Sequence, residues 1–228
     1  MIGKTLTAFF AMLGTCALAQ ASELIPRFGS TATLDKPTGR PRGSIILMPG
    51  GDGRLGIQSD GSITALRGNQ LVRTRQAYAA RGFATLTLDA SASPAQAVEY
   101  MRTIARPVVV VATSRGATRA PAALSGRPDG MVLTSAMLDT FQAYAGSPGA
   151  LPRTLVLHHR QDGCRSTPPS LVEPFAAWAG GRARVVWLTG GVDRGDSCQA
   201  GGHHGFAGLD GQVVAQVVGF ANSLRASR

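Results

Sequence analysis

A serine in a turn of small residues is the first feature of this sequence that could do chemistry. Residues 108–117 read Val-Val-Val-Val-Ala-Thr-Ser-Arg-Gly-Ala, which is typical of a buried strand, a small-x-Ser-x-Gly turn and a helix. Such a turn exposes the serine hydroxyl at a strand end, and small neighbours let strand and helix approach each other. Ser114 could instead be an ordinary helix N-cap. We predict that Ser114 is a nucleophile, with Ala112 standing where glycine is usual.

An acid and a base follow Ser114 along the chain. Asp162 comes after the apolar run 154–158, and His204 ends a glycine-rich loop before the last helical segment. A histidine that accepts the serine proton needs a carboxylate to orient its ring, and loops after later strands can supply both groups. We therefore predict a triad of Ser114, Asp162 and His204. The sequence leaves open His203 as the base, and as the acid Asp139, ranked second, or Asp193 or Asp196.

The segment Gly50-Gly51-Asp52-Gly53 follows the first strongly apolar run and could bind a developing oxyanion. Glycines allow backbone N–H groups to turn into a site, and the residue after the nucleophile supplies a second N–H. We predict that Gly51 or Asp52 donates the first hydrogen bond and Arg115 the second. The alternative is an ordinary turn at a strand end. A phosphate-binding loop is disfavoured because its lysine and Ser/Thr are missing.

Two cysteines flank the predicted acid and base. Cys164 lies two residues after Asp162, and Cys198 lies six residues before His204. In an oxidising compartment an even pair of thiols normally forms a disulfide, which here would tie the acid loop to the base loop. A zinc site is the competing interpretation, but no standard ligand spacing occurs, so we expect no metal. The residues that could form such a site are His158, His159, Asp162, Cys164, Cys198, His203 and His204.

Short apolar runs alternate with segments of helical periodicity, which predicts an α/β fold with a mostly parallel sheet covered on both faces. The predicted strands are 44–48, 84–89, 108–112, 130–134, 154–158 and 184–188. The last of them should begin at Val185, because Arg182–Arg184 is too basic for a core. The predicted helices are 69–81, 94–105, 115–124, 168–179 and 211–225. Residues 22–43 are expected to form one weak edge strand and turns. The interval 134–154 is too short for a lid domain.

The N-terminus has the pattern of a secretory signal peptide: Lys4, an apolar run from Leu6 to Leu18, and a small-x-small site at 19–21. The run is shorter than the roughly 20 residues that a membrane span needs. We expect cleavage to remove residues 1–21, with Cys16, and to leave a single domain over 22–228 in the periplasm or outside the cell. A membrane anchor and a lipoprotein signal at Cys16 are the weaker alternatives.

The formal net charge of +10 comes almost wholly from arginine, since Lys4 and Lys36 are the only lysines. The arginines form no basic run with interleaved aromatic residues, so the pattern disfavours nucleic-acid binding. We expect a solvated basic surface and no nucleic-acid partner.

From Gly43 to the C-terminus the chain resembles the α/β-hydrolase superfamily, and more narrowly its small, lid-less, exported members related to dienelactone-hydrolase-like proteins. The resemblance rests on the segments 50–53, 113–116, 158–164 and 203–206. It implies a doubly wound sheet and serine-based acyl transfer to water, without a cofactor. True dienelactone hydrolases use a cysteine nucleophile, so lactone hydrolysis is not carried over.

The expected function is therefore a carboxylesterase-like serine hydrolase acting on a small-molecule acyl substrate. The alternative of another class is a catalytically silent binding protein with the same fold. Thioesterase and peptidase activity stay open, and the sequence indicates neither the natural substrate nor the oligomeric state.

Overall fold

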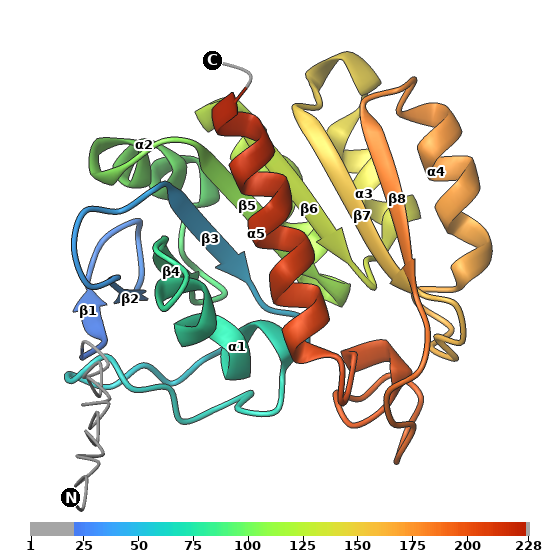
Figure 1. Cartoon of the computed structure of the whole chain (residues 1–228), viewed down its shortest axis with the longest axis horizontal. Helices are drawn as coiled ribbons and strands as arrows, with labels where there is room; N and C mark the ends of the chain where they lie inside the picture. The colour runs from blue at the N-terminus through green and yellow to red at the C-terminus, as the bar shows by residue number, and fades with distance from the viewer. Residues whose placement is uncertain (1–20, 227–228) are drawn as a thin grey trace, which may run out of the picture.

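The computed structural model describes residues 21–226, and one sheet runs through the whole of that part (Figure 1). Its eight strands lie in the order β1-β2-β4-β3-β5-β6-β7-β8. The pairs β1–β2 and β2–β4 are antiparallel, whereas every pair from β4 to β8 is parallel. The strand bounds are β1 Glu23–Ile25, β2 Ala32–Asp35, β3 Ser44–Met48, β4 Ala84–Leu88, β5 Val108–Thr113, β6 Gly130–Thr134, β7 Arg153–His159 and β8 Ala183–Leu188.

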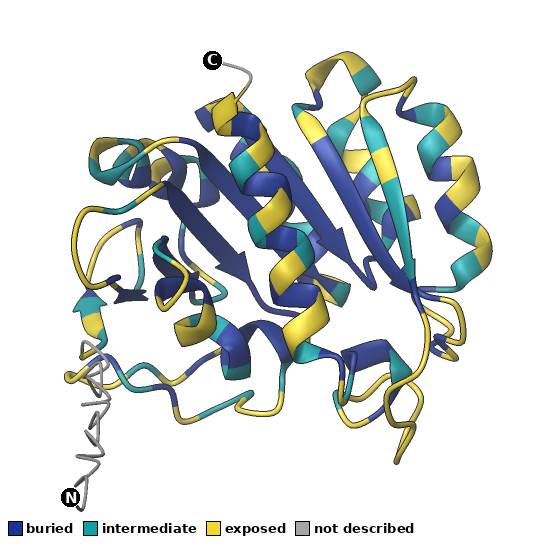
Figure 2. Ribbon diagram, viewed as in Figure 1, coloured by how far each residue is buried: buried dark blue, intermediate teal, exposed yellow. Residues whose placement is uncertain are grey.

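Side chains along the central strands alternate between two hydrophobic cores, one on each face of the sheet. On β5, Val108, Val110 and Ala112 belong to one core. Val109 and Val111 belong to the other core. All of them are fully buried, as Figure 2 shows for the central strands, because successive strand residues point to opposite faces and both faces are covered. The unbroken valine run predicted from the sequence is thus explained by burial on both sides.

Helices cover both faces of the sheet. Helix α5 crosses one face, as Figure 1 shows, and α1 packs in the same core beside it. Helices α2, α3 and α4 pack in the core of the opposite face. The helix bounds are α1 Gln70–Ala79, α2 Pro94–Ile104, η1 Ser114–Thr118, η2 Ala120–Gly126, α3 Leu138–Ala145, η3 Pro148–Ala150, η4 Pro169–Leu171, α4 Val172–Trp178, η5 His203–Gly205 and α5 Asp210–Ala226, where η denotes a 3₁₀ helix.

The predicted α-helix over 115–124 is wrong. The chain forms two 3₁₀ helices there, η1 and η2, which meet at Arg119. Pro121 has no N–H for the i→i−4 bond of an α-helix, and Gly116 has a low helix propensity. The shorter 3₁₀ pattern satisfies the backbone instead. No α-helix therefore begins directly behind Ser114 in this segment of the described chain.

Three other differences from the predictions concern the two edges of the sheet and the connection between β6 and β7. Residues 22–43 form two antiparallel strands rather than one. Strand β8 begins at Ala183 and not at Val185, because it is an edge strand and Arg184 can face solvent there. Helix α3 lies in the interval 134–154, where no helix was predicted. This helix has no side-chain N-cap, so the sequence lacks the usual signal for a helix start. Burial of Leu138 and Phe141 stabilises the helix instead.

The predicted signal peptide lies almost wholly in residues 1–20, outside the described residues. Among the helices of residues 21–226, none is both long and apolar enough to cross a membrane. The described part forms one sheet with helices on both faces, and only α3 and η3 occupy the interval between β6 and β7.

Candidate active site

Ser114 lies at a sharp turn between β5 and η1. Its φ is +50°, a left-handed conformation that is strained for any residue other than glycine. Hydrogen bonds hold the turn: the Ser114 N–H donates to the Ser135 carbonyl over 3.1 Å, and the Met137 N–H donates to the Ser114 carbonyl over 3.4 Å. The strained turn projects the hydroxyl beyond the carboxyl end of the sheet, as a nucleophile requires.

Two glycines allow the loop after β3 to approach this turn. A methyl group on Gly116 would collide with the carbonyl oxygens of Met48 and Pro49, the latter at 2.6 Å. A methyl group on Gly50 would lie 2.9 Å from the Ser114 Cβ. Both positions therefore need a residue without a Cβ. Ala112 is fully buried in the core and tolerates its methyl group.

His204 is the histidine that faces Ser114. Its Nε2 lies 3.1 Å from the Ser114 Oγ. Its Nδ1 lies 3.0 Å from the Asp162 Oδ2 and 3.1 Å from the Thr167 Oγ1. Because Nδ1 faces a carboxylate, Nδ1 carries the proton, and Nε2 is then free to accept the proton of the serine.

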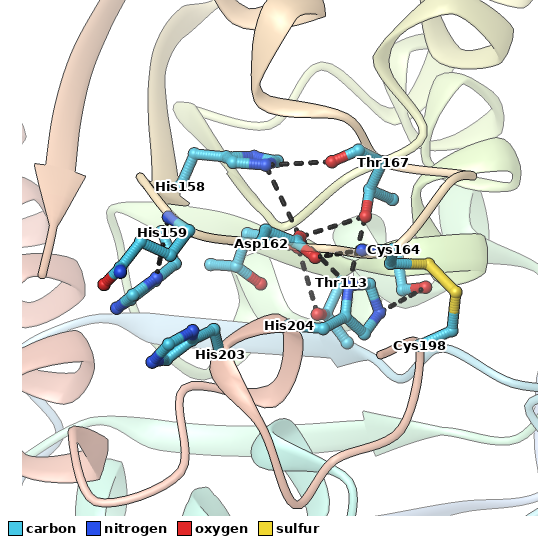
Figure 3. Close-up of polar contacts among 12 residues, drawn as sticks. Thr113, His158, His159, Asp162, Cys164, Thr167, Cys198, His203 and His204 are labelled. Carbon is cyan, nitrogen blue, oxygen red and sulfur yellow. Dashed lines mark hydrogen bonds and ion pairs between the residues drawn. A yellow bond between two sulfur atoms is a disulfide. The ribbon is translucent and has the colours of Figure 1, made fainter. Parts of the chain in front are cut away.

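Asp162 is buried and accepts several hydrogen bonds (Figure 3). The Cys164 N–H donates to its Oδ1 over 2.9 Å, and the Thr167 hydroxyl donates to its Oδ2 over 3.0 Å. Burial by itself raises the pKa of this carboxyl, but the hydrogen bond and the positive potential of His204, with the Cys164 N–H, lower the pKa of Asp162 below its ordinary value. The carboxylate is therefore ionised and able to orient His204.

The other acids and the other histidine do not join this chain of hydrogen bonds. The His203 ring stacks on the His159 ring with centroids 4.1 Å apart, and the His203 backbone N–H donates to the Asp193 carboxylate. Asp196 accepts from the Cys198 N–H. Asp139 is exposed in the first turn of α3, where it accepts from the Thr140 N–H. Adjacent residues of a tight turn point in different directions, which separates His203 from His204.

The Cys164–Cys198 disulfide is present and joins the two loops that carry the acid and the base. Cys164 is buried beside Asp162, whereas Cys198 is exposed in the long loop that leads to His204. The cross-link restricts the motion of that loop relative to Asp162. Figure 3 shows the disulfide next to the His204 ring.

A pocket of about 360 Å³ opens over Ser114 and His204. Gly51 and Arg115 line it, whereas Asp52 does not. The Gly51 N–H donates to no group within residues 21–226, and its φ of +66° suits only glycine. Asp52 is exposed, and its carboxylate accepts from the Arg54 N–H. Of the two residues predicted to supply the first oxyanion donor, Gly51 is the one at the pocket.

The sequence predicts no part in catalysis for two buried residues near Asp162 and His204: it gives Thr167 no role, and it indicates His158 only as a possible zinc ligand. Thr167 bonds both Asp162 and His204, and the His158 Nε2 lies 3.0 Å from the Thr167 carbonyl oxygen and 3.4 Å from the Asp162 Oδ2. The position of His158 directly before the acid loop was the one available signal. In residues 21–226 no group of three or more His, Cys, Asp or Glu side chains is arranged to hold a metal ion.

Several solved structures have a similar fold. A sugar hydrolase from Lactococcus lactis is 13% identical, with a TM-score of 0.63 over 90% of this chain and 98% of that one. A soluble variant of monoglyceride lipase from Saccharomyces cerevisiae is 9% identical, with a TM-score of 0.60 over 92% and 96%. An α/β serine hydrolase without a lid, from Xanthomonas campestris, is 14% identical, with a TM-score of 0.53 over 76% and 85%.

The chain has the α/β-hydrolase fold. In this fold a nucleophile turn links a strand to a helix at the carboxyl end of the sheet, and Ser114 lies at such a turn between β5 and η1. No protein-family profile matches the sequence, and no curated protein matches it either. The likeness is thus one of fold, and the α/β-hydrolase assignment rests on topology.

Proposed function

We propose that this protein is a serine hydrolase that cleaves small ester or related acyl substrates through Ser114, His204 and Asp162. The observation that supports the proposal is the unbroken hydrogen-bond chain from the Ser114 Oγ through the His204 ring to the Asp162 carboxylate, with both contacts at 3.0–3.1 Å. The base contacts the nucleophile, and a third group orients the base, which is the geometry of an activated serine.

In the first half-reaction, the Ser114 Oγ attacks the acyl carbonyl carbon while the His204 Nε2 takes the hydroxyl proton. The carbonyl π electrons move onto oxygen, and the resulting oxyanion accepts hydrogen bonds from the Gly51 and Arg115 N–H groups. The tetrahedral intermediate then collapses. The C–O bond to the leaving alcohol breaks, His204 returns the proton to that alcohol, and an ester of Ser114 remains.

In the second half-reaction, water attacks the acyl-Ser114 ester. His204 removes a proton from the water, the same N–H groups hold the second oxyanion, and the Ser114 Oγ leaves with the proton that His204 returns. Asp162 stays ionised throughout and stabilises the imidazolium form of His204. All groups that these steps use belong to the chain or to substrate and water.

The size of the pocket favours small substrates. Its volume of about 360 Å³ is at the lower end of ligand pockets, which span roughly 300–1,000 Å³. Polar residues such as Asn69, Ser166 and Gln199 line it together with Leu66 and Met137. A mixed lining of this kind accommodates a short acyl group and a polar leaving group better than a long alkyl chain.

We also propose that the protein acts in the periplasm or outside the cell. The Cys164–Cys198 disulfide supports this, because structural disulfides persist in oxidising compartments. Cell fractionation of a strain that expresses the full chain, followed by intact-mass measurement, tests whether the protein is exported and loses residues 1–21.

Labelling with a fluorophosphonate probe, followed by mass spectrometry, tests the proposed nucleophile. We expect one adduct on Ser114, and we expect His204→Ala to abolish it because the serine then lacks a base. His203→Ala is the matched control: it removes the adjacent histidine and is expected to keep the adduct. A folded, oxidised protein that gives no adduct would contradict the hydrolase proposal and favour the catalytically silent binding protein.

A panel of acyl substrates then tests the substrate class. We expect acetyl and butyryl esters to be hydrolysed faster than lauryl esters, because the pocket is small. Matched thioesters and amides in the same panel separate esterase from thioesterase and peptidase activity. Preference for the lauryl ester would contradict the size argument.

A further inference from the structure

A second buried histidine contacts the carboxylate that orients His204. His158 lies at the end of β7, where its side chain is fully buried, and its ring packs edge-on against Trp187 with centroids 5.8 Å apart. Its Nε2 lies between two acceptors, the Thr167 carbonyl oxygen at 3.0 Å and the Asp162 Oδ2 at 3.4 Å. Figure 3 shows the ring above Asp162, on the side away from the disulfide.

The hydrogen-bond partners determine where the His158 proton resides. Burial lowers the pKa of His158 and keeps the ring neutral near pH 7, so it carries one N–H. The Thr167 carbonyl oxygen can only accept, and therefore Nε2 donates to it. The Nδ1 atom is then an unprotonated nitrogen, which is buried without a partner among the described residues. A buried ring nitrogen without a hydrogen-bond partner lowers the stability of the fold, so packing alone does not explain why a histidine occupies this position.

The contact with Thr167 connects His158 to the acid and the base of the proposed triad. While its carbonyl oxygen accepts from His158, the Thr167 hydroxyl donates to the Asp162 Oδ2 and lies 3.1 Å from the His204 Nδ1. Fixing the carbonyl of Thr167 therefore fixes the hydroxyl that touches both the acid and the base. The same His158 N–H also lies near the Asp162 Oδ2, the oxygen that accepts from His204.

We propose that His158 is a positioning residue of the triad: its Nε2–H anchors Thr167 and, through it, holds the Asp162 carboxylate against the Nδ1 of His204. The inference rests on the proposed serine hydrolase function. It predicts that loss of the His158 donor impairs proton transfer at Ser114 chiefly while the Asp162 carboxylate is present to be positioned, because the His158 ring hydrogen-bonds neither Ser114 nor His204.

The experiment measures the fluorophosphonate labelling rate of Ser114 in the oxidised protein for a double-mutant cycle. The variants are His158→Phe, Asp162→Asn and the combination of both. Phenylalanine keeps the ring and removes the donor. We expect His158→Phe to slow labelling about tenfold or more in the wild-type background and to have almost no effect in the Asp162→Asn background, because residues that act as a unit are not additive.

Conservative variants separate a lost donor from a damaged fold. The glutamine amide nitrogen reaches the place of the histidine Nε2, whereas that of asparagine stops near Nδ1. We therefore expect His158→Gln to restore most of the labelling rate and His158→Asn to behave like His158→Phe. If His158→Phe does not fold, the comparison of the glutamine and asparagine variants still tests whether a hydrogen-bond donor is needed at the position of Nε2. The matched control is His159→Gln, because His159 is also buried at this strand end but its ring contacts the Gly190 carbonyl and the Gln161 N–H, not the Asp162 carboxylate.

Three results would overturn the inference: wild-type labelling in His158→Phe, a loss of equal size in both backgrounds, or equal rates for the glutamine and asparagine variants. Failure of the proposed function itself looks different, because the unmodified protein would then show no adduct on Ser114 before any substitution at His158.

Discussion

Replacing Asp162 with asparagine should inactivate the protein by reversing the tautomer of His204. The environment of Asp162 determines how an asparagine would sit there. The Cys164 N–H donates to Oδ1 over 2.9 Å, so the amide oxygen of the asparagine must occupy that position. The amide NH₂ then takes the place of Oδ2, 3.0 Å from the His204 Nδ1. An NH₂ group donates, and Nδ1 must become the acceptor.

The proton of the neutral His204 ring then moves to Nε2, which faces Ser114 at 3.1 Å. A protonated Nε2 cannot take the serine proton, so general-base catalysis is lost although the geometry is kept. The same change in a serine protease triad lowers kcat by about 10⁴-fold. We expect a loss of about 10³–10⁴-fold here, which corresponds to roughly 4–5.5 kcal/mol in the activation free energy.

The assay is the fluorophosphonate labelling rate of Ser114, together with turnover of the best ester substrate at pH 7.5. Asp139→Asn is the matched control, because this carboxylate was the second candidate and lies exposed on α3. It should label at the wild-type rate. Wild-type labelling in Asp162→Asn, or a large loss in Asp139→Asn, would refute the assignment of the acid.

Three further predictions concern stability. Burial lowers the pKa of His158 below its unfolded value of about 6.5. The stability that depends on a neutral His158 is therefore complete above pH 6.5 and is lost as pH falls toward the folded pKa. In urea titrations, the free energy of unfolding should fall less between pH 7.5 and pH 5.5 in His158→Gln than in wild type. The double variant Cys164→Ser/Cys198→Ser opens a loop with a sequence separation of 34, which should lower the free energy of unfolding by roughly 3–4 kcal/mol and reduce labelling of Ser114 in the folded protein. Gly116→Ala should give insoluble protein or lower the free energy of unfolding by more than about 3 kcal/mol, because the added Cβ meets backbone carbonyls. Gly219→Ala, at an open helical position, should raise the free energy of unfolding by about 0.5–1 kcal/mol in the same urea titrations.

Much of the sheet could be predicted because its strands are buried on both faces. A run such as Val108–Val111 is apolar without alternation, and only a central strand covered on both sides accommodates it. The edges were harder to predict. Strand β1 has three residues and β2 has four, and such short segments are strands only because a neighbour completes their hydrogen bonds. The 3₁₀ helices after Ser114 could not be predicted from the spacing of apolar residues, because they arise from the low helix propensity of Gly116 and the missing N–H of Pro121.

The sequence by itself determined which residues are available for chemistry: the serine in its small-residue turn, and an acid, a base and two cysteines in a compatible order. Chain order limits which groups can meet at the carboxyl edge of a parallel sheet. Only the tertiary structure shows that His204, and not His203, lies beside Ser114 and that Gly51, and not Asp52, lines the pocket, because neighbours in a turn point in different directions by angles that spacing does not encode. The same holds for Thr167 and His158, whose contacts with Asp162 arise from the folding of the loop after β7 over the end of its own strand.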